Sequence, residues 1–285
     1  MSIYFAFQAA FFFACSHILI RRGFVASNAM TGSLVSLSMT ALTGWILTFV
    51  LVPVKGLLPQ ALLYFALAGI FAPGLGRTLG YMGIERIGVA RSVPIVNSSP
   101  MIASVFAVFF VGEEWGRQNF LGTCLVICGV IMLSRSQPDK REFRWGDFLL
   151  PILGAFAFAI SANLRKVGLQ IENIPPLAAA VTASTGVLLA LLLTKLQGGR
   201  KALKWSKVSL RWFLIAGLCN SIATISVFYA LSSGKLVIVE PLVATNPVLS
   251  IFLTAIFLKD LEVITRRVAG GALCTVAGTV LVVTA

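Results

Sequence analysis

The 285-residue sequence is poor in charged residues, and poorest in acidic ones. Only 12% of its residues are charged, and Asp and Glu together number 10 against 23 Lys and Arg. It has one histidine, His17, so no centre built from several histidines can bind a metal ion. Its five cysteines lie in apolar stretches without a C-x-x-C pair, which argues against disulfides and cysteine-held metals. The sequence predicts neither a metal ion nor a cofactor.

Motifs for nucleotide binding and hydrolysis are also missing. There is no G-x-x-x-x-G-K phosphate loop, no H-E-x-x-H and no G-x-S-x-G. These absences argue against an ATP-driven pump within this chain, and we expect a protein that is not an enzyme. The net charge of +13 does not indicate nucleic acid, because the basic residues fall almost wholly between apolar stretches. There they act as topology signals and lipid headgroup contacts.

Apolar residues dominate what is present. They make up 58% of the chain, and the mean hydropathy is +0.94. A bilayer core needs about 20 predominantly apolar residues per helix. Ten stretches meet or approach that length: 3–20, 30–52, 61–83, 88–111, 119–134, 148–166, 177–196, 210–231, 235–258 and 265–284. The first lacks a basic start and a cleavage site, so we expect a retained span and not a signal peptide. The sequence predicts an all-α polytopic membrane protein with ten transmembrane helices.

The ten spans divide into two similar halves around the polar connection at 135–147. Segment 14–23 resembles 159–168, and segment 121–130 resembles 270–279. Each half has five spans, an odd number, so the second half crosses the membrane in the opposite sense. We expect two inverted five-helix repeats, at residues 1–137 and 147–285.

Two spans in matching positions each carry two prolines, Pro94 and Pro100 in the fourth, and Pro241 and Pro247 in the ninth. A proline inside a helix leaves a carbonyl without its donor, which hydrocarbon does not tolerate unless protein or a wet cavity receives it. Paired broken helices are the sequence pointer to a transporter site. The polar residues beside these breaks are predicted to line a cavity: Asn97, Ser98, Ser99, Glu240, Thr245 and Asn246. The alternative is that the prolines only kink two helices and the small polar residues join them to neighbours.

Two charged residues lie where a bilayer makes charge costly. Glu240 precedes Pro241 and is a candidate for contact with a substrate amine or for a proton-coupling carboxylate; the alternative is a structural ion pair with Arg91 or Arg77. Arg77 shares a helical face with Tyr81 and could bind a carboxylate or phosphate by two parallel hydrogen bonds. Its alternative role is to extend toward the nearer membrane interface.

Five further polar or aromatic residues are candidates for the same cavity: Ser16, His17, Asn163, Asn220 and Tyr229. Tyr229 occupies the place in the second half that Tyr81 occupies in the first. Each also has a plainer alternative. His17 could be a hydrogen-bonded histidine near the membrane interface. Ser16, Asn163 and Asn220 could be ordinary hydrogen-bonding links between helices, and Tyr229 could belong to the aromatic belt at the interface. We expect the site to lie between helices 1, 3, 4, 6, 8 and 9.

A family resemblance rests on four parts of the first half: segment 74–88, the broken helix after it, the turn Gly112-Glu113-Glu114 and the glycine-rich fifth span. They resemble the EamA type of the drug/metabolite transporter (DMT) superfamily, with two EamA repeats. The resemblance implies a ten-helix carrier with a central cavity that works by alternating access, and it does not imply one substrate. The second half departs from it, with Lys259-Asp260 in place of Gly112-Glu113.

Two arguments about membrane orientation conflict. The odd-numbered connections carry sixteen Lys and Arg and the even-numbered ones five, with Arg165 and Lys166 counted among the five. The positive-inside rule then puts both termini outside the cell. Members of the superfamily that this chain resembles more often keep both termini inside.

These observations predict a secondary transporter, an exporter of a small polar metabolite such as an amino acid across the cytoplasmic membrane. Its partners would be that substrate, the lipid bilayer and protons as a coupling ion. A nucleotide-sugar or phosphate-ester exchanger is the alternative within transport, with Arg77 and Arg91 holding phosphate. The alternative from another class is a membrane-embedded enzyme or receptor that uses the same cavity.

Overall fold

Helices account for the architecture in the computed structural model, which describes residues 1–23, 25–52, 58–87, 92, 95–134, 145–257 and 266–284. The first half contains α1 (Ser2–Gly23), α2 (Ala29–Leu51), α3 (Pro59–Gly69), the π-helix η1 (Ile70–Gly76), α4 (Arg77–Ile87), α6 (Ser99–Phe106), the π-helix η2 (Ala107–Val111) and α7 (Arg117–Ser134). The second half contains the 3-10 helix η3 (Trp145–Phe148), α8 (Leu149–Ile171), α9 (Pro175–Leu196), the 3-10 helix η4 (Gly199–Ala202), α10 (Lys207–Ser233), α11 (Leu236–Val243), α12 (Asn246–Phe257) and α13 (Arg266–Val283).

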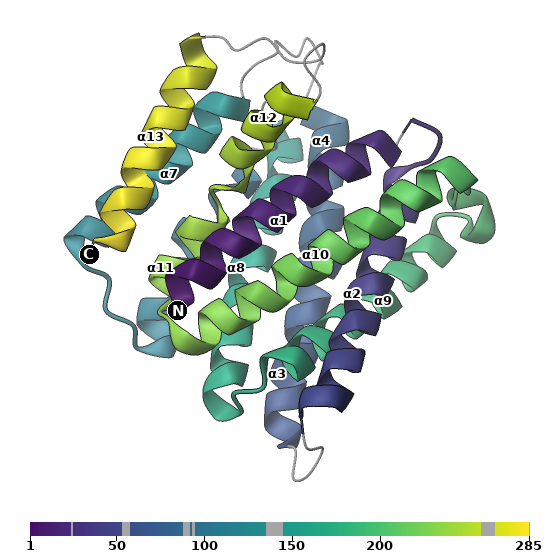
Figure 1. The fold of residues 1–285 in the computed structure, drawn as a ribbon, viewed down its shortest axis with the longest axis horizontal. Coiled ribbons are helices and arrows are strands. Elements are labelled where there is room, and N and C mark those ends of the chain that lie inside the picture. The colour runs from purple at the N-terminus through teal and green to yellow at the C-terminus, as the bar shows by residue number, and fades with distance from the viewer. Residues whose placement is uncertain are drawn as a thin grey trace.

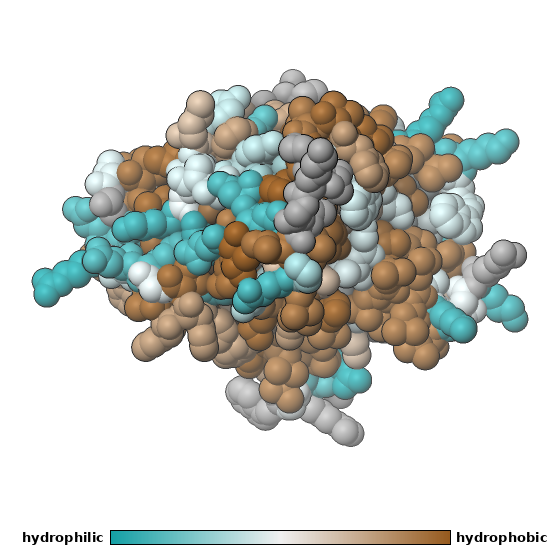
Figure 2. Space-filling model, turned by 90° about the horizontal axis from the view of Figure 1, so that it is seen from below, coloured by the Kyte–Doolittle hydropathy of each residue, from teal (hydrophilic) through white to brown (hydrophobic). Residues whose placement is uncertain are grey.

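The predicted all-α polytopic membrane fold is confirmed. Within the described residues, six helical segments are long and apolar enough to cross a bilayer: Ser2–Ile20, Met30–Leu51, Pro59–Gly80, Gly146–Ile171, Pro175–Leu196 and Lys207–Ser233. Shorter apolar helices cover Ser99–Val111, Arg117–Met132, Leu236–Ser250 and Gly270–Val283, which are the other four predicted spans. Apolar side chains cover most of the face in Figure 2, with hydrophilic side chains gathered in separate patches.

Local chemistry sets where several helices begin. The Asn28 side chain accepts a hydrogen bond from the Thr31 N–H and so caps α2. Pro59 and Pro175 each occupy the first position of their helix, where a missing N–H has no cost. At the end of η2, Gly112 takes a φ of 74°, a left-handed conformation that glycine adopts without strain.

Helix contacts repeat between the two halves. The contact of α1 with α10 has its counterpart in the contact of α8 with α3, η1 and α4. Contacts of α2 with α10 correspond to those of α9 with α3, and contacts of α1 with α11 and α12 correspond to those of α8 with α6. The pairs α2–α9, α6–α11 and α7–α13 are their own counterparts. This is the neighbour pattern that two repeats related by a two-fold axis produce.

Helices α7 and α13 pair at one edge of the bundle (Figure 1). A Cβ added at Gly122 or Gly278 would meet backbone of the facing helix, so the two backbones approach closely there. Small residues permit such close packing between membrane helices.

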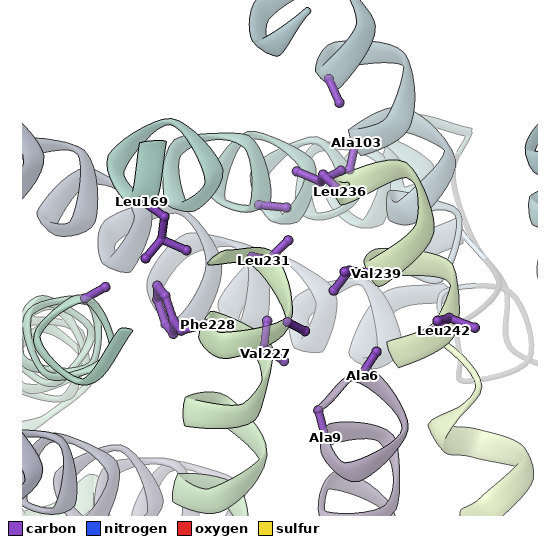
Figure 3. Packing of buried hydrophobic residues seen from close by; sticks show 14 of the residues in the cluster. Ala6, Ala9, Ala103, Leu169, Val227, Phe228, Leu231, Leu236, Val239 and Leu242 are labelled. Carbon is purple, nitrogen blue, oxygen red and sulfur yellow. The ribbon is translucent and has the colours of Figure 1, made fainter. Parts of the chain in front are cut away.

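A cluster of buried residues fills the middle of the bundle. Many of its members are alanines, among them Ala6 and Ala9 of α1 and Ala103 of α6. Figure 3 shows Val227, Phe228 and Leu231 of α10 in the same cluster as residues of α11. The cluster therefore joins helices of both halves.

The predicted interruptions of the fourth and ninth spans fall between the two prolines of each. In the ninth span α11 ends at Val243 and α12 begins at Asn246, and in the fourth a turn at 97–98 precedes α6. Pro100 and Pro247 each occupy the second position of the helix that follows, while Pro241 lies inside α11. Pro94 and Arg91 lie outside the described residues, as do the side chains of Tyr81 and Pro247.

A third interruption was not predicted. The third span passes through the π-helix η1, which contains Pro73. Proline removes a backbone donor, and an extra residue in the turn is one way for a helix to absorb that loss. The corresponding helix of the second half, α10, runs unbroken from Lys207 to Ser233.

Two placements by sequence were wrong. Arg165 and Lys166 lie inside α8 and not in a connection, so they do not belong in the charge count of the even-numbered connections. The other concerns Glu113: because it ends an apolar span at a turn, the sequence predicts a solvated turn residue, but its side chain is buried at 8% exposure. Its carboxylate accepts hydrogen bonds from backbone groups of α11, which removes the need for water.

Candidate functional site

A cavity of about 500 Å³ lies between the two halves. Its lining from the first half consists of Phe13, His17, Leu37, Thr40, Ala72, Pro73, Gly76, Arg77, Gly80, Ser92, Val96, Asn97, Ser99 and Pro100. Its lining from the second half consists of Phe158, Arg165, Thr182, Ala183, Asn220, Thr224, Val227, Phe228, Glu240, Val243, Ala244 and Asn246. Spans 1, 3, 4, 6, 8 and 9 contribute, as expected, and so do α2 and α9.

Glu240 carries the negative charge of this lining. It lies one turn into α11, and among the described residues no group donates a hydrogen bond to its carboxylate. An ionised carboxylate at membrane depth requires a partner, because burial without one is costly. Water, a proton or a bound cation in the cavity can supply such a partner.

Arg165 of α8 faces the same space. Its Nε and Nη2 donate to Ser161 Oγ over 3.2 and 3.0 Å, and its guanidinium carbon lies 5.9 Å from the centre of the Phe228 ring. The charges of Arg165 and Glu240 act on each other. Between these two described side chains, however, no N···O distance is 4.0 Å or less. The pair faces one cavity without closing a direct ion pair.

A second cation lies on the first-half side of the cavity. Arg77, at the start of α4 just beyond η1, donates from Nη1 to Ser33 Oγ over 2.7 Å. His17 of α1 lines the same cavity. Among the described charged residues of the lining there are thus two arginines and one glutamate.

Amides and hydroxyls complete the polar lining. Asn220 donates to Thr40 Oγ1 over 3.0 Å, which links α10 to α2. Asn246 donates to the Val243 carbonyl over 3.0 Å, and so satisfies one group freed at the break in the ninth span. Asn97 and Ser99 flank the corresponding break in the fourth span. These side chains leave acceptor or donor capacity for a polar ligand.

Five predicted residues have described side chains that are not part of the lining. Ser16 Oγ donates to the Ala216 carbonyl over 2.9 Å, and Asn163 donates to the Ala103 and Ala159 carbonyls, each over 3.0 Å. Ser98 and Thr245 donate to carbonyls at the two breaks, and the Tyr229 ring stacks on Phe5 at 5.3 Å. These contacts link helices or satisfy backbone, as the alternatives for such residues propose.

Some lining residues were not predicted as site residues. Arg165 was assigned to a connection, although Ser161-Ala-Asn-Leu-Arg165 places it one turn beyond a polar pair on the same helix. Pro73, in the middle of the third span, was also overlooked. Like the prolines of the fourth and ninth spans, it indicates a break in the helix. Nothing in the sequence distinguishes Thr40, Thr182 or Phe158 from ordinary helix-packing residues.

The cavity does not extend beyond Glu240 among the described residues at one end of the bundle. We call this the termini end, because Met1 and Val283 lie there (Figure 1). Leu231, Leu236, Val237 and Val239 are fully buried there. Toward the opposite end, the lining reaches Gly80 and Ser92.

Both halves of the sequence match one family. Residues 1–135 and residues 144–284 each match the EamA-like transporter family. The chain belongs to the EamA-like transporter family. As a member of that family it has a small-molecule substrate and the membrane as partners. A search of curated proteins gave no significant match.

The fold of this EamA-like transporter has been observed in other chains. It is similar to a solved structure titled only "Crystal structure of protein", with a TM-score of 0.82 and 14% sequence identity. The similarity covers 99% of this chain and 98% of that one. At this identity the comparison concerns the fold alone.

Proposed function

We propose that this EamA-like transporter is a secondary carrier for a small polar metabolite, best matched by an amino acid, and that it works by alternating access. The observation that carries the proposal is the cavity between the halves, with Arg165 and Glu240 both facing it and no direct ion pair between these two described side chains. Its volume of about 500 Å³ lies within the usual range for small-molecule sites. Rocking of one repeat against the other about a site between them is a common mechanism in such folds.

A zwitterion matches the charge arrangement. The Glu240 carboxylate lacks a hydrogen-bond donor among the described residues and can receive an ammonium group, while Arg165 can receive a carboxylate. An amino acid carries both groups on one carbon, and Arg165 and Glu240 line one cavity of about 500 Å³. Phe228 and Val243 beside them offer an apolar wall for a side chain.

The test is uptake and counterflow of labelled metabolites in proteoliposomes. The most informative compounds share one side chain and differ only in their charged groups: an amino acid, the same compound without its amino group, and the same compound without its carboxyl group. We expect saturable flux of the zwitterion, lost in Glu240→Gln and in Arg165→Gln and kept in Glu114→Gln, whose parent side chain is exposed. Equal flux of all three compounds would contradict the assignment.

We propose further that Glu240 couples transport to protons. A carboxylate that faces the cavity can carry either a substrate ammonium or a proton, so the two would exchange at one group. Glu240→Gln should then remove the dependence of flux on a pH gradient, with Glu114→Gln as the control. If the Gln variant keeps the dependence of the wild type, this coupling role is refuted.

Net export from the cytoplasm fits the direction in which the cavity extends. Gly80 and Ser92 lie toward the end opposite the termini, and the described basic residues of the odd-numbered connections, among them Arg22, Arg86 and Lys204, lie at that end. If the positive-inside rule sets the orientation, this conformation faces the cytoplasm and can load substrate from there.

A second candidate within transport is exchange of a nucleotide sugar or another phosphate ester. The observation that favours it is a second arginine, Arg77, in the lining, since guanidinium groups bind phosphate through paired hydrogen bonds. Strict dependence of uptake on a counter-substrate would support this candidate. An enzyme or receptor is the remaining alternative, and conversion of a ligand by purified protein without separated compartments would support it.

A further inference from the structure

Glu113 reaches from the first half into the second. It follows Gly112 at the end of η2, and its Oε1 and Oε2 accept hydrogen bonds from the backbone N–H groups of Leu236 and Val237, over 2.7 and 3.0 Å. These are the first two residues of α11, where N–H groups have no partner within the helix. A carboxylate is also favoured there by the helix dipole.

Lys166 of α8 completes the same contact. Its Nζ donates to the carbonyls of Leu231 and Gly234 over 2.8 and 2.6 Å, and lies 3.9 Å from Glu113 Oε1. The two carbonyls are at the C-terminal end of α10, where a cation is favoured. Side-chain exposures of 12% for Lys166 and 7% for Glu113 place the pair out of bulk water.

This pair lies directly behind the two charged residues of the cavity. Lys166 follows Arg165 on α8, and Glu240 is one turn beyond the N–H groups that Glu113 binds. Leu231 and Leu236, whose backbone groups bind Lys166 and Glu113, are fully buried members of the cluster in Figure 3. A path from the cavity to the termini end that passes between the two halves at α11 would separate α11 from the turn that holds Glu113.

We infer that Glu113 and Lys166 form a latch that closes the termini end of the cavity and positions α11, and that the latch opens in each transport cycle. The inference rests on the proposed alternating access. Hydrogen bonds to charged groups stabilise more than those between neutral groups. Loss of one should favour the conformation open at the termini end by about tenfold or more.

The experiment measures accessibility and needs no substrate. Ala244, in the cavity lining, is changed to Cys in a protein whose five native cysteines are replaced, and a membrane-impermeant maleimide is applied to each side separately. Exposed Lys235→Cys marks the termini side and exposed Lys204→Cys marks the opposite side. Glu113→Gln should raise labelling of Ala244→Cys from the termini side by about tenfold and lower it from the other side.

Matched variants separate a latch from general loosening. Lys166→Met should shift labelling in the same direction, Lys166→Arg much less, and Glu114→Gln not at all. Unchanged labelling in both Glu113→Gln and Lys166→Met, or an equal rise from both sides, would refute the latch. Flux of the metabolite panel is measured on the same wild-type preparations. If the wild-type protein transports no compound of the panel, the proposed carrier function is refuted. The labelling experiment still tests the latch, because it does not depend on transport of a substrate.

Discussion

At the scale of single residues, the described charges inside the bundle face one small cavity: Arg77, Arg165 and Glu240 all line it. On insertion scales a charge at the centre of a membrane helix costs about 2.5 to 3.5 kcal/mol. Arg165 is supported by Ser161 and the Phe228 ring, whereas Glu240 has no donor among the described residues. A ligand with an ammonium group would supply a hydrogen-bond donor to Glu240 and gain binding energy there. A ligand with a carboxylate would gain binding energy from Arg165.

Arg165 is expected to discriminate by geometry as well as by charge. Arg165→Lys keeps the charge and removes the paired hydrogen bonds of the guanidinium, so substrate affinity should fall about tenfold. Arg165→Gln should reduce it further. Substrate affinity is measured by calorimetry or by concentration dependence of counterflow. A lysine variant with the affinity of the wild type would contradict a bidentate contact.

Ser16 is expected to contribute to stability and not to affinity. Its hydroxyl binds the Ala216 carbonyl and is 1% exposed. Ser16→Ala should lower the free energy of unfolding by about 1 kcal/mol, the usual contribution of such a hydrogen bond. Thermal unfolding in detergent measures the stability, and counterflow measures the substrate affinity. A large loss of affinity in a variant of unchanged stability would instead place Ser16 in contact with substrate.

At the scale of elements, helix interruptions and helix pairs have different tasks. The breaks at 97–98 and 244–245 and the π-helix η1 bring backbone and polar side chains to the cavity. The α7–α13 pair contributes no lining residue among those described, and it packs through close backbone contacts at the edge of the bundle.

Close packing of α7 on α13 makes Gly129 sensitive to substitution. An added Cβ would meet the backbone of Gly271 and Thr275, so Gly129→Ala should force the helices apart and lower stability by about 1–3 kcal/mol. Gly116→Ala is the control, because no atom lies within 4 Å of a Cβ there. Chemical or thermal unfolding in detergent compares the two. Equal stability would contradict the close approach.

At the scale of the whole molecule, the two ends differ in charge and in closure. Arg165 and Lys166 lie well inside α8, which ends only at Ile171, whereas the other counted residues that the structure describes lie in connections or near helix ends; the even-numbered connections then retain Lys55, Arg117 and Lys235. The opposite end carries basic residues joined by local contacts, such as Arg22 with its guanidinium 5.1 Å from the Trp212 ring. The bias in charge is therefore stronger than the sequence count.

Orientation can be measured directly. With the native cysteines replaced, Lys204→Cys should be protected from an impermeant maleimide in intact cells, and Lys235→Cys should react, if the positive-inside rule holds. The reverse pattern would put both termini in the cytoplasm. That is the orientation expected from the family resemblance. The cavity would then extend toward the outside, which would favour uptake over export.

The sequence by itself determined the class of protein, the number of spans, the two halves and the broken fourth and ninth helices. Hydropathy and proline are local properties, and a bilayer leaves few folds for them to specify. Only the tertiary structure decided which polar groups face the cavity. Ser16, Asn163 and Thr245 differ from Thr40 and Asn220 by the direction of a side chain between packed helices. Only the tertiary structure brought Glu113 to the start of α11 and Lys166 to the end of α10, since these contacts join residues far apart in the chain.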